Sequence, residues 1–165
     1  MIRPAVPEDI PAIAHLIRAL AEYEKLTQEV VLNEVNLREH LFGPRPCCEA
    51  LIAEGAGLPV GFALYFFNYS TFLAKPGLYL EDLFVLPEFR GRGLGKALFL
   101  EVARQAVVRG CGRFEWAVLD WNEPAIGFYK KMDAVAMDDW TVYRLMGPAL
   151  ENLVGQAARP VSGSD

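Results

Sequence analysis

The chain has 165 residues, of which 53% are apolar and 22% charged, and its formal net charge is −5. This length and composition predict one folded domain with its own core and exclude a wholly disordered chain. The negative charge argues against a nucleic-acid-binding face and suits a small cationic partner. The first residues lack a basic segment followed by an apolar run, and no apolar run is long enough to span a bilayer. We therefore expect a cytoplasmic protein without membrane contact.

In chain order, apolar runs broken by glycine and proline predict strands and helices in alternation. A short strand is expected at residues 2–3, then a helix that begins between Pro7 and Pro11 and ends near Tyr23. A helix at 33–41 precedes strands at 47–53 and 59–69, a long loop at 70–77 and a strand at 78–86. A helix at 93–109, a strand at 114–119, a helix at 122–132 and a strand at 140–146 follow.

This order of elements predicts one α/β domain over residues 1–148, in which helices flank a mixed sheet. The remaining residues, 149–165, are expected to form a C-terminal tail. We expect one helical turn at 149–154 and disorder from residue 157.

The three cysteines are Cys47, Cys48 and Cys111. Adjacent cysteines do not form an ordinary disulfide, and the sequence has no C-x-x-C motif, so we expect free thiols in a reducing compartment. Neither His15 nor His40 has a neighbour at metal-ligand spacing, and we expect no metal site.

The predicted strand at 78–86 is apolar along almost its whole length, which is typical of a central strand covered on both faces. It nevertheless contains Glu81 and Asp82. A carboxylate in such a strand is costly unless it is partnered or functional, and we favour a function for Glu81 over a structural role. Since side chains alternate along a strand, Asp82 is expected on the opposite face.

A glycine-rich loop, RGRGLGK from Arg90 to Lys96, separates this strand from the next predicted helix. Glycine lets backbone N–H groups approach an anion closely, and a helix N-terminus adds a favourable partial charge. The spacing fails the P-loop pattern, because Ala97 stands where that motif has Ser or Thr. It also fails the dinucleotide fingerprint, whether that motif is started at Gly91 or at Gly93. A plain solvated turn is the alternative.

The remaining pattern, Arg90-x-x-Gly93-x-Gly95, resembles the coenzyme A loop of the GCN5-related N-acetyltransferase (GNAT) superfamily. Residues 120–129, DWNEPAIGFY, resemble the N-x-x-A/S-x-x-F-Y segment of that superfamily. Residues 79–85 (YLEDLFV), with the YE pair at 23–24, Phe42-Gly43-x-x-Pro46 and the WNEP segment, resemble the branch that contains the diamine (spermidine/spermine) and thialysine acetyltransferases. The resemblance implies a twisted mixed sheet splayed between its fourth and fifth strands, acetyl-CoA in that opening, and a homodimer.

The resemblance also implies roles for individual residues. Glu81 is the candidate base that deprotonates the amine, directly or through a water, and Tyr129 is the candidate acid for the thiolate, since a phenol has an ordinary pKa of about 10. The alternative for Tyr129 is a core aromatic, and for Tyr23 and Glu24 a solvated helix end. The implied substrate-binding residues are Tyr23, Glu24, Glu81 and Asp82. The implied acetyl-CoA-binding residues are Leu83, Phe84, Val85, Arg90, Gly91, Arg92, Gly93, Leu94, Gly95, Lys96, Asn122, Pro124, Ala125 and Tyr129.

We therefore expect an N-acetyltransferase that moves the acetyl group of acetyl-CoA to a primary amine of a small cationic molecule. A polyamine or diamine and a lysine-like amino acid such as thialysine both satisfy this pattern. A peptide or protein acetyltransferase is disfavoured by the predicted loop at 70–77, and a coenzyme-binding module without turnover by Glu81 and Tyr129. One departure from the family is Asp133, which stands where glycine often takes a left-handed conformation; aspartate tolerates it better than most residues.

Overall fold

The computed structural model describes residues 1–157, with side chains described as far as Val154. The chain divides into two units, Met1–Leu119 and Asp120–Asp165. Most of the tail that was expected to be disordered, residues 158–165, lies outside the described residues.

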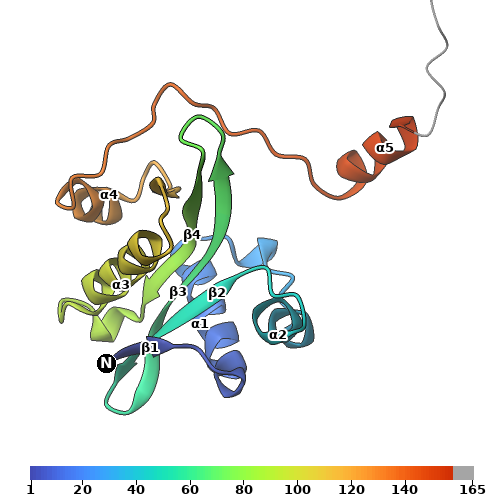
Figure 1. Ribbon diagram of the computed structural model, residues 1–165. Coiled ribbons are helices and arrows are strands. Elements are labelled where there is room, and N and C mark those ends of the chain that lie inside the picture. Colours follow the sequence, from blue (N-terminus) through green and yellow to red (C-terminus); the bar gives the residue numbers. More distant parts are fainter. Residues whose placement is uncertain (158–165) are drawn as a thin grey trace, which may run out of the picture. The chain divides into compact units, whose positions relative to one another are not determined.

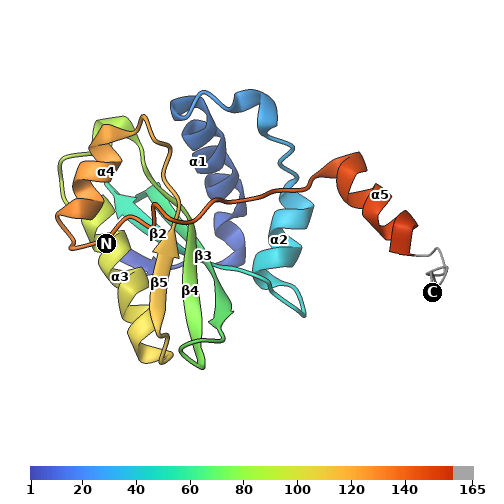
Figure 2. The same ribbon diagram turned by 90° about the horizontal axis from the view of Figure 1, so that it is seen from above.

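A five-stranded mixed sheet in the order β1-β2-β3-β4-β5 forms the centre of the first unit (Figures 1 and 2). Its first four strands pair antiparallel, and β5 runs parallel to β4 after a crossover through helix α3. The strands are β1 (Ile2–Pro4), β2 (Glu49–Gly55), β3 (Leu58–Ser70), β4 (Lys75–Val85) and β5 (Arg113–Trp116). The predicted mixed sheet is confirmed.

Helices cover both faces of this sheet (Figure 2). Those of the first unit are α1 (Ile10–Tyr23), α2 (Glu34–Phe42) and α3 (Leu94–Val108), with short 3-10 turns at η1 (Pro7–Asp9), η2 (Thr27–Glu29) and η3 (Pro87–Phe89). Alternation along β2 directs Ala50 and Ile52 into the core under α1 and α2, and the intervening Leu51 toward α3. Phe62 of β3 and Phe84 of β4 extend the core under α1.

An ion pair joins the edge strand β1 to the start of α1. The carboxylate of the buried Asp9 accepts hydrogen bonds from the Arg3 guanidinium at 2.6 and 2.9 Å and from the Val6 N–H at 2.8 Å. Arg3 also donates to Glu54 at 2.7 Å. Hydrogen bonding to Arg3 lowers the pKa of Asp9, so the pair stabilises the fold at neutral pH.

Two predicted elements of the sheet differ in the structure. The expected loop at 70–77 is a turn of residues 71–74, because β3 and β4 continue to pair as far as Ser70 and Lys75. The strand expected at 140–146 is wrong: these residues have no regular secondary structure, and the Tyr143 side chain is 91% exposed. An apolar alternation specifies a strand only where a neighbouring strand offers hydrogen-bond partners, and within residues 1–157 the sheet pairs five strands.

The second unit contains helices α4 (Glu123–Lys130) and α5 (Gly147–Ala157) among its described residues. The predicted helix at 122–132 corresponds to α4, and the single turn expected at 149–154 is part of the longer α5. Asp133 follows α4 with φ of +60°, which confirms the left-handed conformation expected there. Among residues 1–157 we find no helix of the length and apolarity that crossing a membrane requires.

Candidate active site

The β4–β5 ladder ends halfway along β4. Gly77 to Leu80 pair with the four residues of β5, whereas β4 continues to Val85 beside β3 alone. The backbone edge that follows Leu80 is thus outside the ladder on the β5 side, and such an edge can pair with an extended ligand. This is the predicted opening between the fourth and fifth strands. The side chains of Phe84 and Val85 are buried, as expected if their main chain carries the function.

A β-bulge lies at the start of this open edge. Leu64 of β3 pairs with Asp82, while the next residue, Tyr65, pairs with Leu80, so Glu81 is an extra residue in β4. Strict alternation does not hold across a bulge. The premise that placed Glu81 and Asp82 on opposite faces is therefore wrong.

The two neighbouring carboxylates differ in exposure. Glu81 is exposed and Asp82 is partly buried. Burial, and after it the negative charges of Glu81 and Glu24, together raise the pKa of Asp82 to about 7. The cost of burying a carboxylate in this strand was expected for Glu81. It applies to Asp82 instead, because Glu81, at the bulge, is exposed to solvent.

The end of α1 contributes the third carboxylate. Glu24 is the C-cap residue of α1, and burial raises its pKa. The contact of Tyr23 with Phe84 places the end of α1 beside this part of β4, and the charge of Glu24 is among the causes that raise the pKa of Asp82. We call Glu24, Glu81 and Asp82 the acidic cluster; its charge suits a cationic ligand. Tyr23, beside Glu24, lies with its ring centroid 6.4 Å from that of Phe84.

The glycine-rich loop leads from η3 into α3. Gly91 and Gly93 have φ of +74° and +80°, in the left-handed region that favours glycine, and nothing lies within 4 Å of a Cβ added to either. The helix predicted to start at residue 93 is the 15-residue α3; Gly93 is its N-cap, and residues 94–96 form its first turn. An open, Cβ-free approach to a helix N-terminus fits the pyrophosphate of a coenzyme.

The two arginines of the loop make different contacts. The Nε of Arg90 donates to the Val85 carbonyl at 2.8 Å. Its guanidinium carbon lies 4.5 Å from the ring centroid of Tyr23 and 5.3 Å from that of Phe84. The structure thus brings a predicted coenzyme-binding residue and a predicted substrate-binding residue into contact, which the sequence did not indicate. Arg92 keeps its contacts within η3 and the loop.

The other predicted site residues belong to the second unit. The Asn122 side chain caps α4 by accepting a hydrogen bond from the Ala125 N–H at 3.4 Å, and Pro124 lies in the first turn, where proline is tolerated. The ring of Tyr129 lies 5.3 Å from that of Phe128. Their roles toward acetyl-CoA stay predictions.

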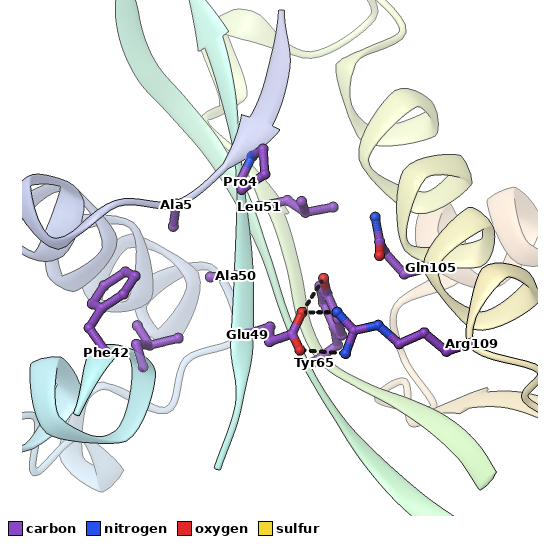
Figure 3. Close-up of a pocket in the computed structure, with 10 residues that line it drawn as sticks. Pro4, Ala5, Phe42, Glu49, Ala50, Leu51, Tyr65, Gln105 and Arg109 are labelled. Atoms are coloured by element: carbon purple, nitrogen blue, oxygen red, sulfur yellow. Dashed lines mark hydrogen bonds and ion pairs between the residues drawn. The ribbon is translucent and has the colours of Figure 1, made fainter. Parts of the chain in front are cut away.

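A separate pocket of about 210 Å³ lies between the start of β2 and the end of α3 (Figure 3). Its polar wall is Glu49, whose carboxylate accepts from Arg109 at 2.6 and 2.7 Å and from the Tyr65 hydroxyl at 3.1 Å. Burial, followed by the Glu49 charge, raises the pKa of Tyr65. None of the predicted site residues lines this pocket. We assign Glu49, Tyr65 and Arg109 a structural role, because the Glu49 carboxylate and the Arg109 guanidinium are already paired with each other.

The three cysteines are free thiols, with Cys47 exposed. In the part of the chain that the structure describes, no three His, Cys, Asp or Glu side chains gather in a way that could hold a metal ion.

The fold and the loop identify the class of protein. The model of the acetyltransferase (GNAT) family matches residues 12–134, which is most of the chain. This chain belongs to that family.

The chain is also similar to individual proteins of stated activity. The chain is 40% identical to the thialysine N-ε-acetyltransferase of Bos taurus, over 94% of this chain and 98% of that protein. It is 35% identical to the L-ornithine N5-acetyltransferase NATA1 of Arabidopsis thaliana, over 91% and 86% of the two chains. Among solved structures, an integron cassette protein from the mobile metagenome of V. cholerae superposes with a TM-score of 0.78 at 24% identity, over 93% of this chain and 96% of that one, which supports the fold.

Replacing Gly93 with valine should weaken coenzyme A binding by about 10-fold or more, because a β-branched residue resists positive φ and its side chain would fill the approach to the helix N-terminus. Calorimetric titration with coenzyme A measures the effect. Gly110→Val is the matched control: Gly110 also has positive φ and open space, but lies at the other end of α3. Equal affinities in a folded Gly93→Val variant would contradict the site.

Replacing Asp82 with asparagine should stabilise the protein more at pH 8 than at pH 5. The folded pKa of about 7 exceeds the ordinary value of 3.8, so the folded state retains a proton that the unfolded chain has lost, and stability falls as pH rises between these values. Thermal melts across this range measure the difference. Asp9→Asn is a control with the opposite expected effect. The pKa of Asp9 is lowered in the folded state, so its ionised carboxylate stabilises the fold above about pH 3.8, and this variant should lose stability there. A pH-independent gain for Asp82→Asn would contradict the assignment.

Proposed function

We propose that this protein transfers the acetyl group of acetyl-CoA to the side-chain amine of a small cationic amino acid of the thialysine or ornithine type. The observation that carries the proposal is the acidic cluster, which joins the end of α1 to the β4 bulge at the open edge of the sheet. Two relatives are named as acetyltransferases of thialysine and of ornithine, and both of these molecules are amino acids with a second amine.

Coenzyme binding is proposed to use main-chain groups of the first unit. When bound, acetyl-CoA supplies the thioester carbonyl that the amine attacks. The N–H groups of residues 91–96 would hold its pyrophosphate, and the open edge at Leu83–Val85 would hold its extended arm. Asn122, Pro124 and Ala125 are proposed to contact the same arm, as the family resemblance implies.

The acidic cluster is proposed to bind the substrate as a cation and then accept a proton from it. An ammonium group must lose a proton before it can attack, and Glu81 is proposed to receive that proton directly or through a water. Glu81 is exposed and would then release this proton to solvent. Asp82, whose pKa is raised to about 7, can hold a proton of its own near neutral pH. Binding of the cation would itself lower the pKa of Asp82, because an opposite charge favours the ionised carboxylate.

Tyr129 is proposed to act on the leaving group. The leaving thiolate needs a proton after the carbon–sulfur bond breaks, and Tyr129 is proposed as its donor. The ordinary pKa of a phenol, about 10, suits this transfer because it lies close to that of a thiol.

A polyamine is the second candidate substrate. Three carboxylates in one cluster exceed the two ammonium groups of thialysine or ornithine, and this favours a molecule with more cationic groups. A lysine-like substrate additionally needs a donor for its own carboxylate, whereas a polyamine does not.

The remaining parts of the proposal concern location and assembly. A reducing, cytoplasmic setting is supported by the three free thiols. A homodimer is supported by the exposed apolar side chains of Trp140, Val142 and Tyr143, which a second copy could cover. Membrane and nucleic-acid partners are not part of the proposal.

A panel of amines assayed with acetyl-CoA and a thiol reagent tests the function. We expect turnover with thialysine and ornithine, slower turnover with spermidine, and little with an amine that is neutral at pH 7, such as aniline. Added salt should raise the KM for the cationic amines, because it screens their attraction to the acidic cluster. Faster turnover of aniline than of every cation would contradict a cationic substrate, and faster turnover of spermidine would favour the polyamine.

The two proton-transfer roles predict different kinetic defects. Tyr129→Phe keeps the ring but removes the hydroxyl, and should lower kcat by roughly 10²-fold with little change in Tm. Glu81→Gln should lower kcat/KM most near neutral pH and recover in part at high pH, where free amine is available without a base. Tyr69→Phe and Glu151→Gln, at exposed positions, serve as controls. If both test variants keep normal rates across the pH range, neither residue carries the chemistry.

A further inference from the structure

The contact between Tyr23 and Arg90 joins two parts of the site that the proposed function uses separately. Tyr23 ends α1 immediately before Glu24, on the side proposed for the amine. Arg90 begins the glycine-rich loop, on the side proposed for the pyrophosphate. The Arg90 guanidinium carbon lies 4.5 Å from the Tyr23 ring centroid, well within the range of a cation–π interaction.

The Arg90 side chain is anchored at several points. Its Nε donates to the Val85 carbonyl, and its guanidinium also lies 5.3 Å from the ring centroid of the buried Phe84. Within the described residues its two Nη groups make no hydrogen bond, so they are the donors that remain to meet an anion. A planar guanidinium held against two rings presents these donors in a fixed direction.

Arg92 offers an internal comparison. Its guanidinium carbon lies 5.3 Å from the ring centroid of Phe89 and one Nη donates to the Glu88 carbonyl at 3.2 Å, so both partners belong to η3, next to the loop itself. Of the two loop arginines, only Arg90 contacts α1 within the described part of the chain. An effect of α1 on coenzyme binding should therefore pass through Arg90.

We propose that Tyr23 is a positioning residue for the coenzyme: it holds the Arg90 guanidinium at the glycine-rich loop and thereby couples acetyl-CoA binding to amine binding at Glu24. The inference rests on the proposed function. A ligand that orders the end of α1 would order the Arg90 donors as well, so each ligand should raise the affinity for the other by the same factor.

A double-mutant cycle on coenzyme A affinity, measured by calorimetry, tests the proposal. Tyr23→Leu removes the ring, and Arg90→Lys keeps the charge but loses the planar stack. We expect Tyr23→Leu to weaken coenzyme A binding about fivefold in the wild-type background and less than about twofold in Arg90→Lys, because the stack is already lost there. In the Arg92→Lys background the effect of Tyr23→Leu should be fully retained. Tyr23→Phe, which keeps the ring, should restore affinity.

A second measurement tests the coupling directly. Thialysine should raise the coenzyme A affinity of the wild type severalfold and leave that of Tyr23→Leu unchanged. Coenzyme A is used in place of acetyl-CoA so that no turnover occurs.

The outcomes distinguish a failure of the inferred role of Tyr23 from a failure of the proposed function. Equal effects of Tyr23→Leu in the Arg90→Lys and Arg92→Lys backgrounds, a Tyr23→Phe variant as weak as Tyr23→Leu, or no effect of thialysine on the wild type would each overturn the inference while leaving the coenzyme site intact. A wild-type protein that does not bind coenzyme A would overturn the proposed function, and the inference with it.

Discussion

The candidate site depends on the point at which β5 stops pairing with β4. From Gly77 to Leu80, β4 has a strand on each side, and from there to Val85 it is held by β3 alone. The free edge stays in place because the antiparallel ladder with β3 continues. The bulge at Glu81 falls at this boundary, so the change in pairing and the change in side-chain direction occur at the same residue. The loop that follows Val85 begins beside the open edge.

Two zones of opposite character meet along this edge. The acidic cluster of Glu24, Glu81 and Asp82 attracts a cation, whereas the glycine-rich loop offers N–H groups and a helix N-terminus to an anion. An acetyl transferase must hold an ammonium and a pyrophosphate in the same site without letting them pair with each other. Arg90, stacked on the end of α1, lies where the two zones adjoin.

Local sequence signals predicted the parts of the site that local chemistry determines. The glycines marked the start of α3 at Gly93, and the apolar run at 78–86 marked β4, because both depend on neighbouring residues. The bulge at Glu81 could not be predicted, since it is set by the register with β3 and not by β4 itself. The stack of Arg90 on Tyr23 joins residues far apart in the chain. The segment at 140–146 has a strand-like pattern, but a pattern does not supply the partner that a strand requires.

The connections of the sheet also imply an order of folding. Strands β2, β3 and β4 are joined by short turns, so their ladders close small loops and can form early. Strand β5 reaches β4 only after the whole of α3 has been placed, and its ladder is four residues long. A ladder of this kind forms late in folding and opens at low free-energy cost in the native state. Amide hydrogens of β5 would therefore exchange with solvent sooner than those of β3, and the edge proposed for the coenzyme would adjoin a part of the sheet that opens readily.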